Sequence, residues 1–186
     1  MANPPLRRPH HGRPAPPPGL LRRLDDFARL AFPGFSTGFL MVLAAAPISL
    51  PSPVFAAALP CVFFWSVFRP AAMSPPVIFL LGLLLDLLTL APLGAGVLVL
   101  LAVHGVALRV RRFLARQSFL AVWLAFCVAA VGAAALFWGL QSLLALRLPP
   151  FAPALHAALL SAGLYPAIAL VLTRVHEAMR VAETSP

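Results

Sequence analysis

The stretch that decides the fold is residues 76–108, PVIFLLGLLLDLLTLAPLGAGVLVLLAVHGVAL. It holds one charged residue, Asp86, and it is longer than the roughly 20 residues that one membrane-spanning helix needs. Pro92-Leu93-Gly94 interrupts it, and proline and glycine favour a helix end and a tight turn there. The stretch therefore predicts a hairpin of two short membrane helices, at about 76–91 and 93–108.

The composition of the whole chain agrees with a membrane environment. Of 186 residues, 61% are hydrophobic and 10% are charged, whereas soluble domains carry about 25% charged residues. Further apolar runs, at about 35–50, 54–68, 118–141 and 152–173, predict an all-α, polytopic membrane helical bundle of about six short transmembrane helices. Several runs are short and prolines interrupt the first two, so five spans plus a re-entrant piece is the alternative.

The basic residues predict the orientation of this bundle. All fourteen are arginine, and they lie between apolar runs, which is typical of topology signals rather than of a nucleic-acid-binding face. Six spans with the N-terminus and the C-terminus in the cytoplasm leave only Arg147 outside. No nucleic-acid partner is expected. The largest cytoplasmic basic cluster comprises Arg109, Arg111, Arg112 and Arg116.

Four segments are expected along the chain. Residues 1–19 contain seven prolines and predict a disordered, Pro/Arg-rich cytoplasmic tail. Residues 20–31 place apolar side chains at helical spacing and predict an amphipathic juxtamembrane helix, with a frayed extension of the first span as the alternative. Residues 32–174 are the expected transmembrane domain, and residues 175–186 a short cytoplasmic tail.

Asp86 requires an explanation, because a carboxylate inside a membrane span costs about 2.5–3.5 kcal/mol on insertion scales. The turn at Pro92-Leu93-Gly94 exposes the unpaired N–H groups of the next helix, and a carboxylate there satisfies them and suits the helix dipole. We therefore expect Asp86 to fix the hairpin. A partner-binding role and a proton-linked role are the alternatives. Gly82 lies one turn earlier on the same face and favours close helix packing.

The sequence predicts no catalytic site. His104 and His156 lie in apolar runs without a second ligand three or four residues away, so no metal is expected. Cys61 and Cys127 also lie in apolar runs and are interpreted as small buried hydrophobic residues. No nucleophile motif or phosphate-binding loop occurs. We expect a protein that is not an enzyme and has no cofactor.

Several of these residues recur in an ordered pattern. The pattern runs from Trp65 through Arg69-Pro70, Gly82-Leu-Leu-Leu-Asp86 and Pro92-Leu93-Gly94 to the Arg-rich turn at 109–116. It resembles the MreD family of bacterial rod shape-determining membrane proteins. The resemblance in length and span number covers most of the chain, and its specific motif covers residues 65–96. The Pro/Arg-rich tail departs from the family pattern.

The resemblance implies a non-enzymatic inner-membrane component of cell-wall elongation, with a fold similar to the substrate-binding subunit of energy-coupling-factor transporters. It implies MreC as a partner, together with MreB, RodA and the penicillin-binding transpeptidase of RodA. The hairpin would then dock the transmembrane helix of MreC, while the arginines face anionic membrane lipids. The alternatives are a substrate-binding transporter subunit and a lipid-binding membrane protein. The short, apolar outer loops argue against recognition of a polar vitamin.

Overall fold

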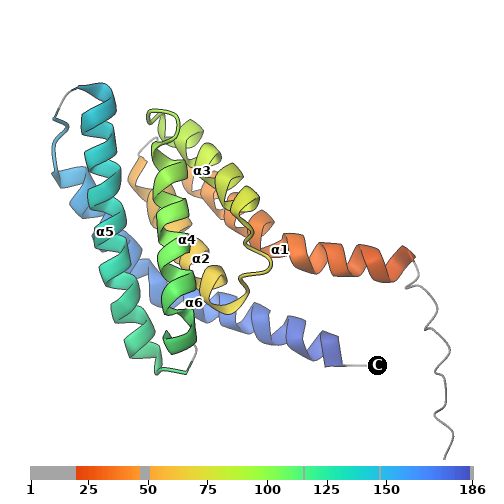
Figure 1. Ribbon diagram of the computed structural model, residues 1–186. Helices are drawn as coiled ribbons and strands as arrows, with labels where there is room; N and C mark the ends of the chain where they lie inside the picture. The colour runs from red at the N-terminus through yellow and green to blue at the C-terminus, as the bar shows by residue number, and fades with distance from the viewer. Residues whose placement is uncertain (1–19, 47–50, 115, 147, 185–186) are drawn as a thin grey trace, which may run out of the picture.

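We analysed a computed structural model, which describes residues 20–46, 51–114, 116–146 and 148–184. These residues form six helices and no strand, so the all-α prediction is confirmed for them. The helices are α1 (Leu20–Ala45), α2 (Pro51–Phe68), α3 (Pro75–Thr89), α4 (Ala95–Leu114), α5 (Phe119–Ala145) and α6 (Ala152–Thr184). Successive helices run in alternate directions through the bundle (Figure 1).

The run at residues 76–108 forms a helical hairpin, as predicted, and its second helix continues six residues beyond the predicted end, to Leu114. The apolar run divides into α3 and α4, which pack against each other. Leu90 ends α3 with φ 51° and ψ 30°, and Gly94 precedes α4 with φ 98°. These left-handed conformations reverse the chain within the few residues between the two helices. Pro92 lies between them, where its missing N–H removes no helical hydrogen bond.

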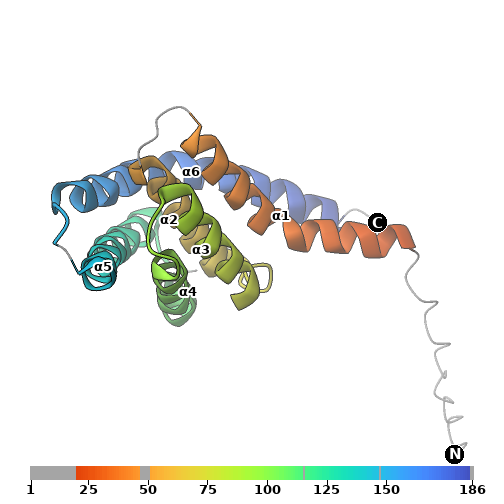
Figure 2. The ribbon, with the colours of Figure 1, turned by 90° about the horizontal axis from the view of Figure 1, so that it is seen from above.

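The core of the bundle is α2. Every residue from Val54 to Val67 is buried, and α2 contacts each of the other five helices. A helix that is apolar on all sides is stable only when it is surrounded. Figure 2 shows α2 in this central position. The remaining helices pair around it, α3 with α4 and α5 with α6.

The outer surface of the bundle is apolar. Large hydrophobic side chains are exposed on α1, α3, α4, α5 and α6, for example Phe35 (76%), Val128 (75%) and Leu170 (63%). Two segments, Phe119–Ala145 and Ala152–Val175, are long and apolar enough to cross a membrane. Contiguous apolar surface of this extent is unusual on soluble proteins and favours a membrane location.

The two ends of the described chain are helical. Residues 20–31 belong to α1, which continues through Pro33 to Ala45. Figure 1 shows α1 bending between its red first half and its orange second half, as expected where proline removes a helical hydrogen bond. At the other end, α6 continues to Thr184. Both helices project beyond the bundle on the same side (Figures 1 and 2). The prediction for residues 1–19 lies outside the described residues.

Candidate functional site

Asp86 is the buried charged group of the hairpin, with only 1% of its surface exposed. Its two carboxylate oxygens accept hydrogen bonds from two backbone N–H groups of the next helix. The Gly94 N–H lies 2.7 Å from Oδ2, and the Gly96 N–H lies 2.6 Å from Oδ1. The contact expected from the sequence, a carboxylate on the N-terminal donors of the following helix, is therefore present.

Asp86 thereby supplies what the start of α4 lacks. Gly94 occupies the N-cap position of α4, where a side-chain oxygen normally satisfies a free N–H, but glycine has no side chain. Asp86 serves both ends of the turn, because its backbone carbonyl also accepts the N–H groups of Leu90 and Ala91. The negative carboxylate at the positive end of the α4 dipole adds electrostatic stabilisation.

Glycines allow this close contact. A Cβ added to Gly82 would lie 2.4 Å from Cα of Val97, so α3 and α4 approach each other too closely for any side chain there. A Cβ on Gly96 would lie 2.6 Å from Oδ1 of Asp86 and would displace the carboxylate. Gly94 is required for a different reason, its φ of 98°.

The structure places Trp65, Arg69 and Pro70 at the other end of the bundle from the hairpin turn. Trp65 is fully buried in α2, and its ring contacts Phe32 of α1 edge-on, with the centroids 6.4 Å apart. Arg69 and Pro70 form the turn that ends α2, in which their carbonyls accept the N–H groups of Ala72 and Met73. The motif residues are therefore divided between two separate places.

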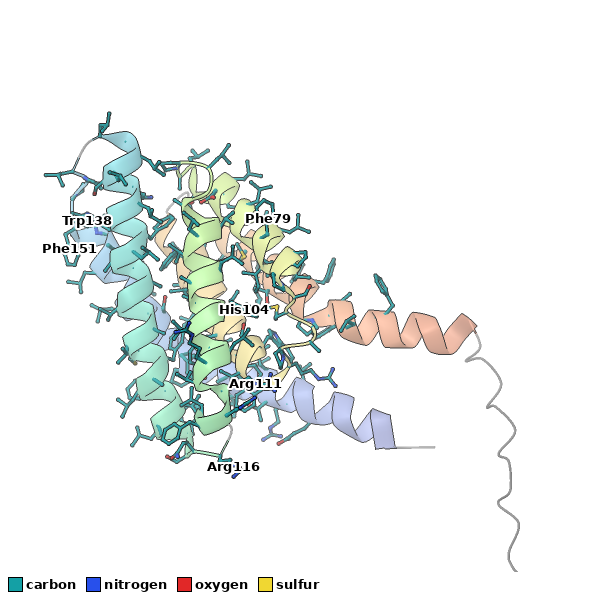
Figure 3. The ribbon with its side chains drawn as sticks, in the orientation of Figure 1. Phe79, His104, Arg111, Arg116, Trp138 and Phe151 are labelled. Carbon is teal, nitrogen blue, oxygen red and sulfur yellow. The ribbon has the colours of Figure 1, made fainter. Side chains whose placement is uncertain are left out.

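The basic cluster lies at the end of α4 and in the turn before α5. Arg109, Arg111, Arg112 and Arg116 are all exposed. Figure 3 shows Arg111 at the end of α4 and Arg116 at the turn, far from Trp138 and Phe151 at the opposite end of the bundle. The turns at that opposite end expose leucines instead, including Leu90 (93%) and Leu146 (89%). Among the residues that the structure describes, exposed arginines gather at the α4–α5 end of the bundle, and exposed leucines at the opposite turns.

One buried polar pair was not expected from the sequence. The hydroxyl of Ser66 lies 2.8 Å from Nδ1 of His104, and this hydrogen bond joins α2 to α4. The spacing of the two residues in the sequence does not predict it, because it depends on how α2 and α4 pack. His156 is exposed. Cys61 is buried as expected, and Cys127 is partly exposed.

A small cavity of about 230 Å³ lies between α2, α5 and α6, near the apolar end of the bundle. Its walls include Phe55, Phe137, Trp138 and three prolines, and Gln141 contributes an amide. The indole N–H of Trp138 is already bonded to the carbonyl of Pro149, at 3.0 Å. The cavity thus presents mostly apolar surface, which suits a small apolar ligand better than a polar one.

The chemistry of the hairpin is that of a structural cap. Both oxygens of Asp86 accept hydrogen bonds from backbone donors, and the side chain is buried. In the part of the chain that the structure describes, no group of three or more His, Cys, Asp or Glu side chains lies close enough to hold a metal ion. Comparison of the chain with protein-family models, curated proteins and solved structures found no match.

Proposed function

We propose that this chain is a six-span inner-membrane protein with both termini in the cytoplasm, and that it acts as a non-enzymatic, MreD-like component of bacterial cell-wall elongation. The observation that carries the proposal is the capped hairpin. Gly82, Asp86 and Gly94, which belong to the hairpin part of the MreD-like pattern, meet in one structural element in which each has a distinct physical task.

The distribution of charge supports the proposed orientation. The exposed arginines at 109–116 lie at the end of the bundle that the alternating helices would place in the cytoplasm, where arginine and lysine are enriched. The opposite turns expose leucine. The exposed apolar side chains of the outer helices would face lipid, where they incur no hydration penalty.

The hairpin offers a lateral face for a partner helix. On α3, Leu80 and Leu87 lie seven residues apart on one side of the helix and are 63% and 59% exposed. The cap at Asp86 and the tight contact at Gly82 hold this face rigid, and rigid surfaces lose less entropy on binding. We infer that it docks the single transmembrane helix of MreC, which brings MreB, RodA and the transpeptidase into the same assembly.

The test compares two double variants in cells that depend on this protein. Leu80→Trp/Leu87→Trp enlarges the proposed docking face, and Leu124→Trp/Val131→Trp makes the same change on exposed positions of α5. We expect the first variant to reach the membrane at normal abundance, lose co-purification of MreC and give rounded cells. The α5 variant should retain MreC and the rod shape.

Two results would contradict the proposal. Equal recovery of MreC with both double variants would show that MreC does not dock on the α3 face. Recovery of a coupling membrane subunit with ATPases in place of MreC would indicate a transporter subunit. The 230 Å³ cavity beside Trp138 favours that second function, because a substrate-binding subunit needs a pocket that opens near the outer face. Its mostly apolar lining, with one side-chain amide from Gln141, would then select a mostly apolar substrate.

A further inference from the structure

A groove of about 510 Å³ lies between α4 and α5, with Phe63 of α2 in its wall. All of its lining side chains are apolar, and most are alanine or valine. They are Phe63, Val99, Ala102, Val103, Val106, Val110, Ala125, Val128, Ala129, Gly132, Ala133 and Leu136. From Val99 to Val110 the groove extends eleven residues along α4, or about 16 Å at 1.5 Å per residue.

The groove stays open because α5 is held on its other side. The indole N–H of Trp123 donates to the carbonyl of Ala162 in α6, at 3.0 Å. Phe126 stacks on Tyr165 of α6 with ring centroids 4.3 Å apart. On the groove side the residues are small, and a Cβ added to Gly132 would meet nothing within 4 Å. The apolar space is therefore built into the packing of the bundle.

The groove ends at the basic cluster. In the antiparallel pair, Val110 of α4 and Ala125 of α5 are the lining residues nearest the connecting turn. Arg109 follows Val106 by three residues and so lies on the same side of α4, and Arg116 lies in the turn itself (Figure 3). A molecule with an apolar chain in the groove would have its head beside these guanidinium groups.

We propose that the groove binds one acyl chain of an anionic phospholipid, with the lipid phosphate at Arg109 and Arg116. The length of the groove, about 16 Å, is close to half of the roughly 30 Å hydrocarbon core, which is the depth of one leaflet. The arginines supply the charge that an anionic head complements. A partner helix fits less well, because the exposed guanidinium groups at the end of the groove complement a phosphate and not the apolar side chains of a transmembrane helix.

This inference depends on the membrane location and not on the elongation partner, so the two can fail separately. The test uses the full-length protein in detergent, titrated with palmitoyl-oleoyl phosphatidylglycerol or with the zwitterionic phosphatidylcholine of the same chains. Native mass spectrometry measures the retained lipid. Gly132→Leu fills the groove and Gly139→Leu is its control, because Gly139 has the same open space on the same helix but does not line the groove.

We expect the wild type and Gly139→Leu to retain phosphatidylglycerol in preference to phosphatidylcholine, and Gly132→Leu to bind it at least tenfold more weakly. Arg109→Gln/Arg116→Gln should weaken binding roughly 30-fold, at about one order of magnitude per 1.4 kcal/mol and about 1 kcal/mol per arginine. Arg111→Gln/Arg112→Gln removes the same charge on other sides of α4 and should weaken it less than threefold.

Four outcomes would overturn the proposal. Equal affinity of wild type and Gly132→Leu would place the lipid elsewhere. Equal affinity for phosphatidylglycerol and phosphatidylcholine would show that the arginines do not contribute to lipid binding. Equal loss in the two arginine double variants would show a general surface attraction in place of a site at the end of the groove. Protection of the groove by a co-purified transmembrane helix, with no lipid retained, would identify a protein occupant instead.

Discussion

The hydroxyl of Ser66 and Nδ1 of His104 lie 2.8 Å apart and fix the register of α2 against α4. The two residues are 0% and 5% exposed, so neither can replace its partner with water. A sliding of either helix by one turn would leave both groups unsatisfied in an apolar environment, at a cost of about 1–3 kcal/mol each. The pair thus selects one packing of the core.

We predict that Ser66→Ala and His104→Leu are coupled. In a double-mutant cycle on unfolding in mixed dodecyl sulfate micelles, the interaction free energy should lie between about 0.6 kcal/mol, the average for such hydrogen bonds between membrane helices, and about 1.7 kcal/mol, the maximum. Ser161→Ala is the matched control, because Ser161 is equally buried but its hydroxyl bonds to Ala157 O in its own helix. Additive effects of Ser66→Ala and His104→Leu would contradict an energetic role of the pair.

Removal of the carboxylate of Asp86 should loosen the hairpin. Asp86→Ala leaves the N–H groups of Gly94 and Gly96 without an acceptor, and we expect a loss of about 2–4 kcal/mol in the free energy of unfolding. Asp86→Asn keeps one acceptor oxygen and should lose about half as much. The measurement is the unfolding midpoint in detergent, and indistinguishable midpoints for wild type and Asp86→Ala would show that the cap is not stabilising.

Replacement by alanine should destabilise the protein at Gly82 of α3 but not at Gly105 of α4. Gly82→Ala would drive Cβ into the backbone of Val97, and we expect a loss of about 1–3 kcal/mol. Gly105→Ala meets open space in α4 and should be neutral or stabilising by up to about 1 kcal/mol, because alanine is the better helix former. Equal midpoints would mean that α3 can move away from α4 without cost.

Replacement of the helix-ending leucine should stabilise the turn. Leu90 adopts φ 51° with 93% of its surface exposed, so Leu90→Gly relieves left-handed strain and loses little packing. We expect a gain of about 1 kcal/mol in the free energy of unfolding. Leu93→Gly, at a position without positive φ, should give no gain. A lower midpoint for Leu90→Gly would show that the exposed side chain makes contacts in lipid.

The hairpin could be predicted from the sequence because its determinants are local. A charge in an apolar run, followed within eight residues by Pro92 and Gly94, admits few arrangements that satisfy both the carboxylate and the free N–H groups. The spacing of Gly82 and Asp86 along one helical face follows from the helical repeat alone. These features require no knowledge of the other four helices.

The Ser66–His104 pair and the groove could not be predicted in the same way. Ser66 meets His104 only because α2 occupies the centre of the bundle, which depends on the packing of all six helices. The alanines and glycine of α5 are compatible with close packing or with an open groove. The contacts of Trp123 and Phe126 with α6 decide between these outcomes, and the sequence does not reveal them.

In the membrane topology proposed above, the capped turn also bears on how the hairpin would enter the bilayer during synthesis. Every hydrogen bond of the Asp86 side chain and of its carbonyl is closed within ten residues of the chain. In that topology the α3–α4 hairpin could leave the translocon as a preassembled pair, with the Asp86 carboxylate already hydrogen-bonded to backbone donors. The carboxylate of Asp86 would then have its hydrogen-bond donors before any later helix is translated, which lowers the cost of inserting it.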